Sequence, residues 1–207
     1  MPANPERVIV YIDGFNLYFG LRDKGWKKYY WLDFNKLALS LLRGDQVLVR
    51  TKYFTSKITS PPDKRKRQEA FLSAVNTLPN FEMHFGRYQT FEQSCRVCGH
   101  KHLDSNEKRT DVNIATHLLV DAFQGAFDTA ILVSADSDLT NPILEINRLF
   151  PQRLVKVAFP PGRFSLELKN AARLSFQIYE GKLRKSLLPE QVVLASGYVV
   201  QRPLSWR

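Results

Sequence analysis

Residues 129–138 read Thr-Ala-Ile-Leu-Val-Ser-Ala-Asp-Ser-Asp, an uninterrupted apolar run that ends in two closely spaced acids. Residues 7–13, Arg-Val-Ile-Val-Tyr-Ile-Asp, have the same form, and residues 154–159 are a third apolar run. Runs rich in Val, Ile and Leu without polar alternation are typical of parallel strands that are covered on both faces. The sequence therefore predicts three central strands, two of which end in aspartate.

Helical patterns separate these strands from two alternating segments, residues 47–54 and 81–88, which we expect to be half-exposed strands nearer an edge. The predicted helices are residues 34–42, 64–78, 111–124, 143–150 and 166–173, with Asp33, Asn141 and Ser165 as N-caps for three of them. This alternation predicts an α/β fold with a mostly parallel, doubly wound sheet.

The chain has 207 residues, 44% of them hydrophobic, which suits one domain with additions. We assign residues 1–188 to this domain and residues 189–207 to a C-terminal tail that is able to form a hairpin. Residues 89–108 lack a steady period and hold both cysteines, so we expect them to be an inserted loop.

The formal net charge of +10 indicates a polyanionic partner, and nucleic acid is the leading candidate. No stretch approaches the roughly 18 apolar residues of a membrane span, and the first residues do not form a signal-peptide core. We therefore expect a cytoplasmic protein with no membrane partner. The sequence does not indicate an oligomeric state.

Four acids lie at predicted strand ends or at a helix start: Asp13, Asp111, Asp136 and Asp138. Each alone has an ordinary explanation as a turn residue or as a first-turn acid favoured by the helix dipole. Together, at one edge of a parallel sheet, they would repel unless a cation neutralised them. Oxygen ligands suit Mg²⁺ or Mn²⁺, and a metal-bound water can act as a nucleophile. The pattern predicts a metal-dependent hydrolase.

Other phosphate-handling families fit the residues less well. A haloacid-dehalogenase-type phosphatase needs a second aspartate where the chain has Phe15, and a Toprim-like domain would have glutamate in place of Asp13. The glycine-rich loops of nucleotide-binding proteins do not occur.

Three motifs resemble those of NYN domains, which belong to the PIN-like nuclease superfamily. They are residues 11–17 (Tyr-Ile-Asp-Gly-Phe-Asn-Leu), residues 107–112 (Glu-Lys-Arg-Thr-Asp-Val) and residues 127–138. The resemblance implies a three-layer, Rossmann-like sandwich and metal-dependent ribonuclease activity. It also implies that Asp13, Asp111, Asp136 and Asp138 hold Mg²⁺ or Mn²⁺, that Asn16 orients substrate or water, and that Ser134 and Ser137 shape the acidic turn.

Two positions depart from the family pattern. Ala135 stands where the family often has glycine, which would strain the turn if a positive φ were needed, and His117 stands where it often has aspartate. We expect His117 to be a surface residue more readily than a metal ligand. These departures leave open an inactive RNA-binding or regulatory module, and a small-molecule phosphohydrolase is a third alternative.

The cysteine pair resembles half of a zinc site, in which Cys95 and Cys98 would be joined by His100 and His102. The competing interpretation is a reduced loop with solvated histidines. Zinc, if bound, would order the insertion and take no part in catalysis.

Basic residues are the candidates for phosphate binding: Lys64, Arg65, Lys66 and Arg67 at the start of one helix, and Arg163 after a central strand. Charge runs are also common on solvated helix faces. Trp26, Tyr88 or Phe91 can stack on a base, although we expect these aromatic residues to be in the core.

Overall fold

The computed structural model describes residues 4–94, 98–99 and 101–207, with the backbone alone for residues 88–93 and 101–108. Six parallel strands form one sheet in the order β3-β2-β1-β6-β7-β8. The strands are β1 (Arg7–Asp13), β2 (Val47–Thr55), β3 (Phe81–Phe85), β6 (Thr129–Val133), β7 (Leu154–Phe159) and β8 (Leu174–Gln177). The predicted α/β class and the central parallel strands are confirmed.

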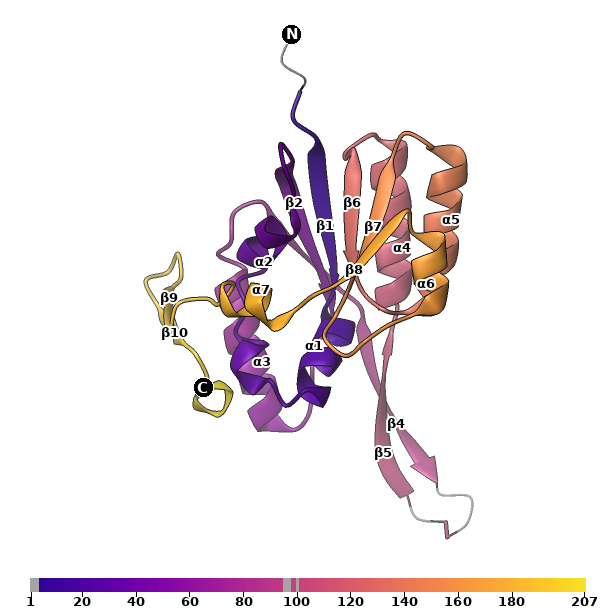
Figure 1. Ribbon diagram of the computed structural model, residues 1–207. Helices are drawn as coiled ribbons and strands as arrows, with labels where there is room; N and C mark the ends of the chain where they lie inside the picture. Colours follow the sequence, from indigo (N-terminus) through magenta and orange to yellow (C-terminus); the bar gives the residue numbers. More distant parts are fainter. Residues whose placement is uncertain (1–3, 95–97, 100) are drawn as a thin grey trace.

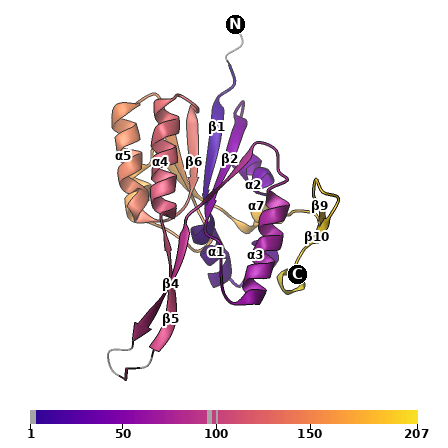
Figure 2. The same ribbon diagram turned by 180° about the vertical axis from the view of Figure 1, so that it is seen from behind.

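Helices cover both faces of the sheet and complete three layers (Figure 1). One face carries α1 (Gly14–Asp23), α2 (Phe34–Leu41), α3 (Pro62–Val75) and α7 (Glu180–Arg184), which share one core cluster. The other carries α4 (Thr110–Phe123), α5 (Thr140–Leu149) and α6 (Leu166–Ala171), and α4 lies beside α5 (Figure 2). No helix in the described part of the chain is both long and apolar enough to cross a membrane.

The side chains of β1 alternate between these two cores. Val8, Val10 and Ile12 pack into the core under α1, α2 and α3, whereas Ile9 and Tyr11 pack under α4 and α5. Because successive side chains point to opposite faces, Asp13 belongs to the α4 face. The strand order reverses between β1 and β6, and ligands of open α/β sheets bind at the carboxyl edge beside such a reversal.

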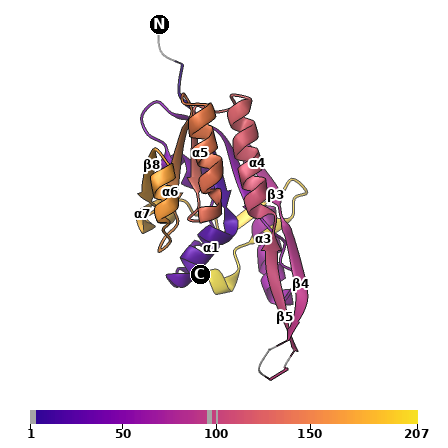
Figure 3. The ribbon, with the colours of Figure 1, turned by 90° about the vertical axis from the view of Figure 1, so that its right-hand side faces the viewer.

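Residues 89–108, expected to be a loop, are largely strand. β4 (Arg87–Ser94) and β5 (Lys101–Lys108) pair antiparallel from Arg87 opposite Lys108 to Ser94 opposite Lys101. We call them the arm, because they extend away from the body of the domain (Figures 1 and 3). A ribbon outside the main sheet has no core face to impose alternating apolar residues, so its sequence does not predict a strand.

Several other boundaries differ from the prediction. Helix α5 begins at Thr140 after the 3-10 helix η2 (Ser137–Leu139), so Asn141 lies in its first turn and is not the N-cap. Asp33 and Ser165 do cap α2 and α6 through their side chains. Helix α1 and strand β8 were not predicted, and β9 (Gln191–Val193) pairs antiparallel with β10 (Val199–Gln201) in the tail. Two further 3-10 helices are η1 (Lys27–Tyr30) and η3 (Leu204–Trp206).

Candidate metal centre

Asp13, the last residue of β1, is buried, with 3% of its surface exposed. Its Oδ1 accepts a 3.0 Å hydrogen bond from the backbone N–H of Asn16, and its Oδ2 accepts a 2.8 Å bond from the Ser134 hydroxyl. Burial raises the pKa of Asp13 to about 6, against the lowering effect of these two bonds. The ionised carboxylate is therefore costly here unless a cation compensates it.

The turn after β6 positions the next acid. The Ser134 hydroxyl accepts a 3.1 Å bond from the backbone N–H of Asp136 while it donates to Asp13. The Asp136 side chain in turn caps η2, because its Oδ1 accepts from the N–H of Asp138 at 3.1 Å. Among the described residues other than glycine only Asn80 and Arg109 have a positive φ, so Ala135 is accommodated without strain.

Asn16 joins α1 to this turn. Its backbone N–H donates to Asp13, and its side-chain Oδ1 accepts a 3.1 Å bond from the backbone N–H of Ala135. The ends of β1 and β6 are thus held together by two side chains, Asn16 and Ser134, whose bonds leave the Asp136 carboxylate facing the same edge as Asp13.

The third acid, Asp111, lies in the first turn of α4, at the point where the chain returns from the arm. The residue before that helix, Arg109, adopts a left-handed φ of 77°. Carboxylate oxygens of Asp13, Asp111 and Asp136 lie within 4.8 Å of one another. Burial raises the pKa of Asp111, and the charges of Asp136 and Asp138 raise it further. Three converging carboxylates with oxygen donors alone can hold a divalent cation.

Asp138 and Ser137 are exposed in η2. Asp138 is outside the group of three, although its charge still raises the pKa of Asp111. The structure therefore brings three of the four predicted acids together and leaves the fourth at the border.

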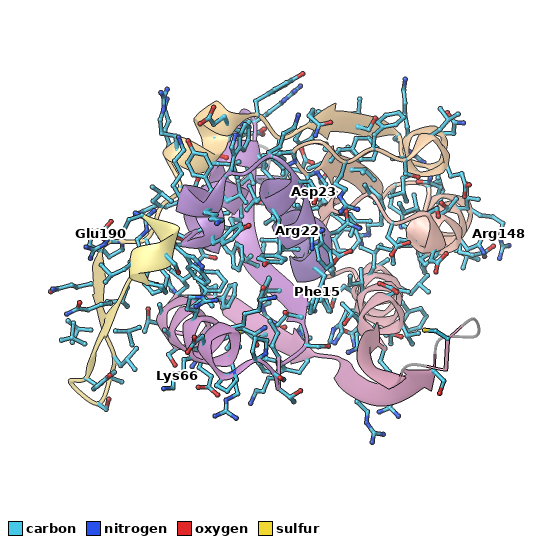
Figure 4. All side chains as sticks on the ribbon, turned by 90° about the horizontal axis from the view of Figure 1, so that it is seen from below. Phe15, Arg22, Asp23, Lys66, Arg148 and Glu190 are labelled. Carbon is cyan, nitrogen blue, oxygen red and sulfur yellow. The ribbon has the colours of Figure 1, made fainter. Side chains whose placement is uncertain are left out.

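The predicted phosphate-binding residues lie on two separate elements. Lys64, Arg65, Lys66 and Arg67 are in the first half of α3, where Arg65 pairs with Glu69 at 3.4 Å. Arg163 follows β7, but its guanidinium forms a 2.9 Å ion pair with Asp23 and lies above the ring of Phe19. Figure 4 views the molecule from below and labels Lys66 on α3 and Phe15 on α1.

The zinc hypothesis concerns the tip of the arm. Cys98 is exposed. Cys95 and His100 lie outside the described residues, as does the side chain of His102. Trp26 packs against the core as expected, whereas the side chains of Tyr88 and Phe91 are also outside the described set.

A buried ion pair beneath the acids was not predicted. The Lys52 ammonium lies 2.6 Å from Asp121 Oδ2, which also accepts a 2.5 Å bond from the Tyr11 hydroxyl, and all three residues are buried. Lys52 lies in β2 and Asp121 in α4, and the sequence around each shows only the periodicity of its strand or helix. The local sequence therefore does not predict the ion pair. The pair is closed by tertiary packing of α4 on β1 and β2.

His117 packs beside this ion pair, whereas we expected a solvated surface residue. It is half-buried, with Nδ1 3.4 Å from the Lys52 ammonium, and its ring lies 3.9 Å from that of His84. Burial lowers the pKa of both histidines. His117 is not in the three-acid group, so in this chain its position contributes packing.

Comparisons with known proteins identify a family and a common fold. The family model of the NYN domain matches residues 7–180. A curated relative, 6-hydroxy-3-succinoylpyridine 3-monooxygenase HspA of Pseudomonas putida, is 27% identical over an alignment of 195 residues, and the match covers 77% of this chain and 61% of that protein. The chain thus spans about three fifths of that relative's length. A crystal structure of a Vibrio parahaemolyticus protein of unknown function is similar with a TM-score of 0.60 and 21% identity, covering 91% of this chain and 99% of that one, which shows a common fold.

Proposed function

This chain belongs to the NYN domain family, and on that premise we propose that it is a metal-dependent ribonuclease. The observation that carries the proposal is the approach of Asp13, Asp111 and Asp136 to within 4.8 Å at the carboxyl edge of the sheet. Such a concentration of negative charge around a buried carboxylate is a cost to the fold that a bound cation would remove.

The donor set fits Mg²⁺ or Mn²⁺. All three side chains offer oxygen, the ligand type that these ions prefer. When bound, such an ion would neutralise phosphate charge and lower the pKa of a coordinated water. We assign direct contacts with the ion to Asp13, Asp111 and Asp136, and we assign to Asp138 the orientation of water at the exposed border.

Neighbouring residues preorganise these carboxylates. Ser134 holds Asp13 and the Asp136 backbone through one hydroxyl, and Asn16 holds the turn between them through Ala135. Fixed ligands need little reorganisation as charge develops on a phosphodiester, which is how preorganised sites lower a barrier. Ser137 is exposed beside Asp136, which supports its proposed role in contacting the substrate.

RNA is the proposed substrate because the chain carries a net charge of +10. Cations that neutralise phosphates release counterions, which favours binding to polyanions without regard to sequence. Lys64 and Arg67 on α3 are the candidate phosphate contacts, since in the described structure neither forms an ion pair with a carboxylate. Arg163 is a weaker candidate because it is paired with Asp23.

The decisive experiment compares cleavage of labelled RNA by the purified chain and by an Asp13→Asn, Asp136→Asn double variant, each with Mg²⁺ or Mn²⁺. We expect metal-dependent cleavage by the wild type and at least about a hundredfold slower cleavage by the variant, as for loss of a main electrostatic contribution. Equal cleavage by both proteins would mean that a contaminant is responsible and would overturn the assignment.

Two alternatives have distinct outcomes in the same assay. RNA binding without cleavage under any divalent ion would identify an inactive binding module. The argument for this alternative from Ala135 is weakened, because Ala135 has no positive φ and does not strain the turn. Turnover of a generic phosphate ester with no binding of RNA would identify a small-molecule phosphohydrolase. The curated relative is named for a reaction on a pyridine, so small aromatic compounds belong among the controls.

A further inference from the structure

A second feature at the same edge of the sheet is an aromatic pocket between α1, η1, α3 and η3. We propose that this pocket binds one base of a single-stranded RNA beside the phosphodiester at the acidic group, an inference that rests on the proposed ribonuclease function. The pocket has a volume of about 370 Å³, within the usual range for sites that enclose small ligands.

Aromatic side chains make up the outer part of the pocket. Tyr18 of α1 is 37% exposed, and its ring lies 5.0 Å from the ring of Tyr30 in η1. Tyr30 in turn contacts Trp206 of η3 edge to face at 5.6 Å. Phe15 is a further lining residue and lies at the start of α1 (Figure 4). Aromatic faces of this kind stack on bases of any sequence.

Residues that adjoin the acidic site along the backbone also line the pocket. Gly14 and Phe15 line the pocket and directly follow Asp13. On the neighbouring strand, Tyr53 and Thr55 line the pocket on either side of Phe54, the residue paired with Asp13. Gly14 is required for this arrangement, since a Cβ there would lie 2.6 Å from the Tyr53 ring. The pocket and the acids thus flank one strand end, on opposite faces of the sheet.

The charge around the pocket matches a nucleotide. Lys27, Lys64 and Arg67 all line it, and none of them is within ion-pair distance of a carboxylate on any described side chain. Arg22 also lines it, paired with Asp23 at 3.1 Å. An apolar peptide or a lipid chain carries no negative charge to pair with these cations. A nucleotide presents a base to the aromatic rings and phosphates to the cations.

One stretch of sequence is consistent with a nucleic-acid-binding role for this pocket. Residues 26–31 read Trp-Lys-Lys-Tyr-Tyr-Trp, which interleaves aromatic and basic side chains. That pattern is typical of surfaces that bind single-stranded nucleic acid, but it fits a buried helical turn equally well. The fold decides which of these rings reach the pocket: Tyr29 and Tyr30 line it as η1 packs against η3, whereas the buried Trp31 does not.

The test measures binding of a short labelled single-stranded RNA by fluorescence anisotropy in the presence of EDTA, so that cleavage does not intervene. Tyr18→Ala is the main variant, because the side chain is partly exposed and its loss leaves the core intact. Tyr198→Ala is the matched control, since Tyr198 is 68% exposed and does not line this pocket. We expect about tenfold weaker binding for Tyr18→Ala and no change for Tyr198→Ala.

A scan with one abasic site moved along the RNA separates base stacking from general attraction. In the wild type, one abasic position should weaken binding about tenfold. In Tyr18→Ala, an abasic site at that position should cause little further loss of affinity, because both changes remove the same stacking contact. Thermal unfolding of each variant shows whether the fold is kept, and Lys64→Ala gives a second readout by reducing the salt dependence of binding.

The outcomes distinguish this inference from the function on which it rests. Metal-dependent cleavage together with equal RNA affinity for wild type and Tyr18→Ala would overturn the pocket assignment and leave the nuclease in place. The pocket assignment also fails, with the nuclease again unaffected, if every abasic RNA binds as tightly as the intact one. Absence of any RNA binding or cleavage by the wild type would overturn both proposals.

Discussion

The Ser134 hydroxyl donates a 2.8 Å hydrogen bond to Asp13 Oδ2 and accepts a 3.1 Å bond from the Asp136 backbone, so one side chain fixes two of the three clustered acids. The Ser134 side chain is fully buried. Among the described residues, Asn16 is the one other residue whose side chain bonds to the turn after β6 from beside the end of β1. The geometry of the acids therefore depends on the buried Ser134 and the half-buried Asn16.

Ser134→Ala should lower the free energy of unfolding by about 1–3 kcal/mol, because it leaves the part-buried Asp136 N–H without its acceptor. The measurement is urea denaturation without added metal. Ser137→Ala is the control from the same turn, exposed and expected to change stability by less than about 0.5 kcal/mol. Equal effects of the two substitutions would contradict the role assigned to Ser134.

Divalent ions should raise the melting temperature of the wild type. At an ion concentration about a hundred times the Kd, the expected stabilisation is roughly 2.7 kcal/mol. Asp111→Asn should weaken Mn²⁺ binding strongly in calorimetric titration, whereas Asp138→Asn should weaken it much less, since Asp138 is outside the group of three. Equal losses for the two variants would show that the fourth acid is also a direct ligand.

The pKa of Asp13 predicts how stability depends on pH. Its folded value of about 6 exceeds the ordinary 3.8, so without metal the stability that is present at low pH is lost as the pH rises through this interval. The loss amounts to about 3 kcal/mol. Asp13→Asn cannot ionise, so its stability relative to wild type should rise from about pH 4 to about pH 7.

Thermal unfolding of both proteins in EDTA across this range provides the measurement. Saturating Mn²⁺ serves as the control, because bound metal stabilises the ionised carboxylate and should remove the advantage of Asp13→Asn. A difference between the two proteins that does not vary with pH would show that the Asp13 carboxylate ionises normally in the fold.

Lys52 and Asp121 form a buried pair, so removing one partner should be costly. Lys52→Met is expected to destabilise by about 3–5 kcal/mol because it leaves the Asp121 charge uncompensated. The double variant Lys52→Met, Asp121→Leu should lower the free energy of unfolding by much less than the sum of the two single substitutions. The exposed pair Arg148 and Glu145 is the control, and Glu145→Gln should change stability by less than about 1 kcal/mol.

The sequence predicts the central strands well because burial on both faces demands continuous apolar residues. The runs that form β1, β6 and β7 have this character. Their limits place one aspartate at the end of β1 and another just beyond β6. Short or peripheral elements lack such a demand. Strand β8 has four residues, and helix α1 begins directly at Gly14, which reads as a turn residue.

The site was predictable only in outline. Strand ends and a helix start indicate which acids converge, but the separation of Asp138 from the other three depends on how η2 turns after Asp136. The contacts among Lys52, Asp121 and His117 could not be predicted from the sequence, because they join β2 to α4 across distant parts of the chain. Pairings of this kind are a product of tertiary packing, which local periodicity does not encode.

The three clustered acids come from the first strand, from the helix after the arm and from the turn after β6. An ion held by all of them would act as a removable cross-link between segments that are remote along the chain. Closing such long loops restricts the unfolded ensemble, and the bond must break before the segments separate. Chelation would then accelerate unfolding without disturbing a single covalent bond, so resistance to proteolysis of the intact chain becomes a measure of ion occupancy.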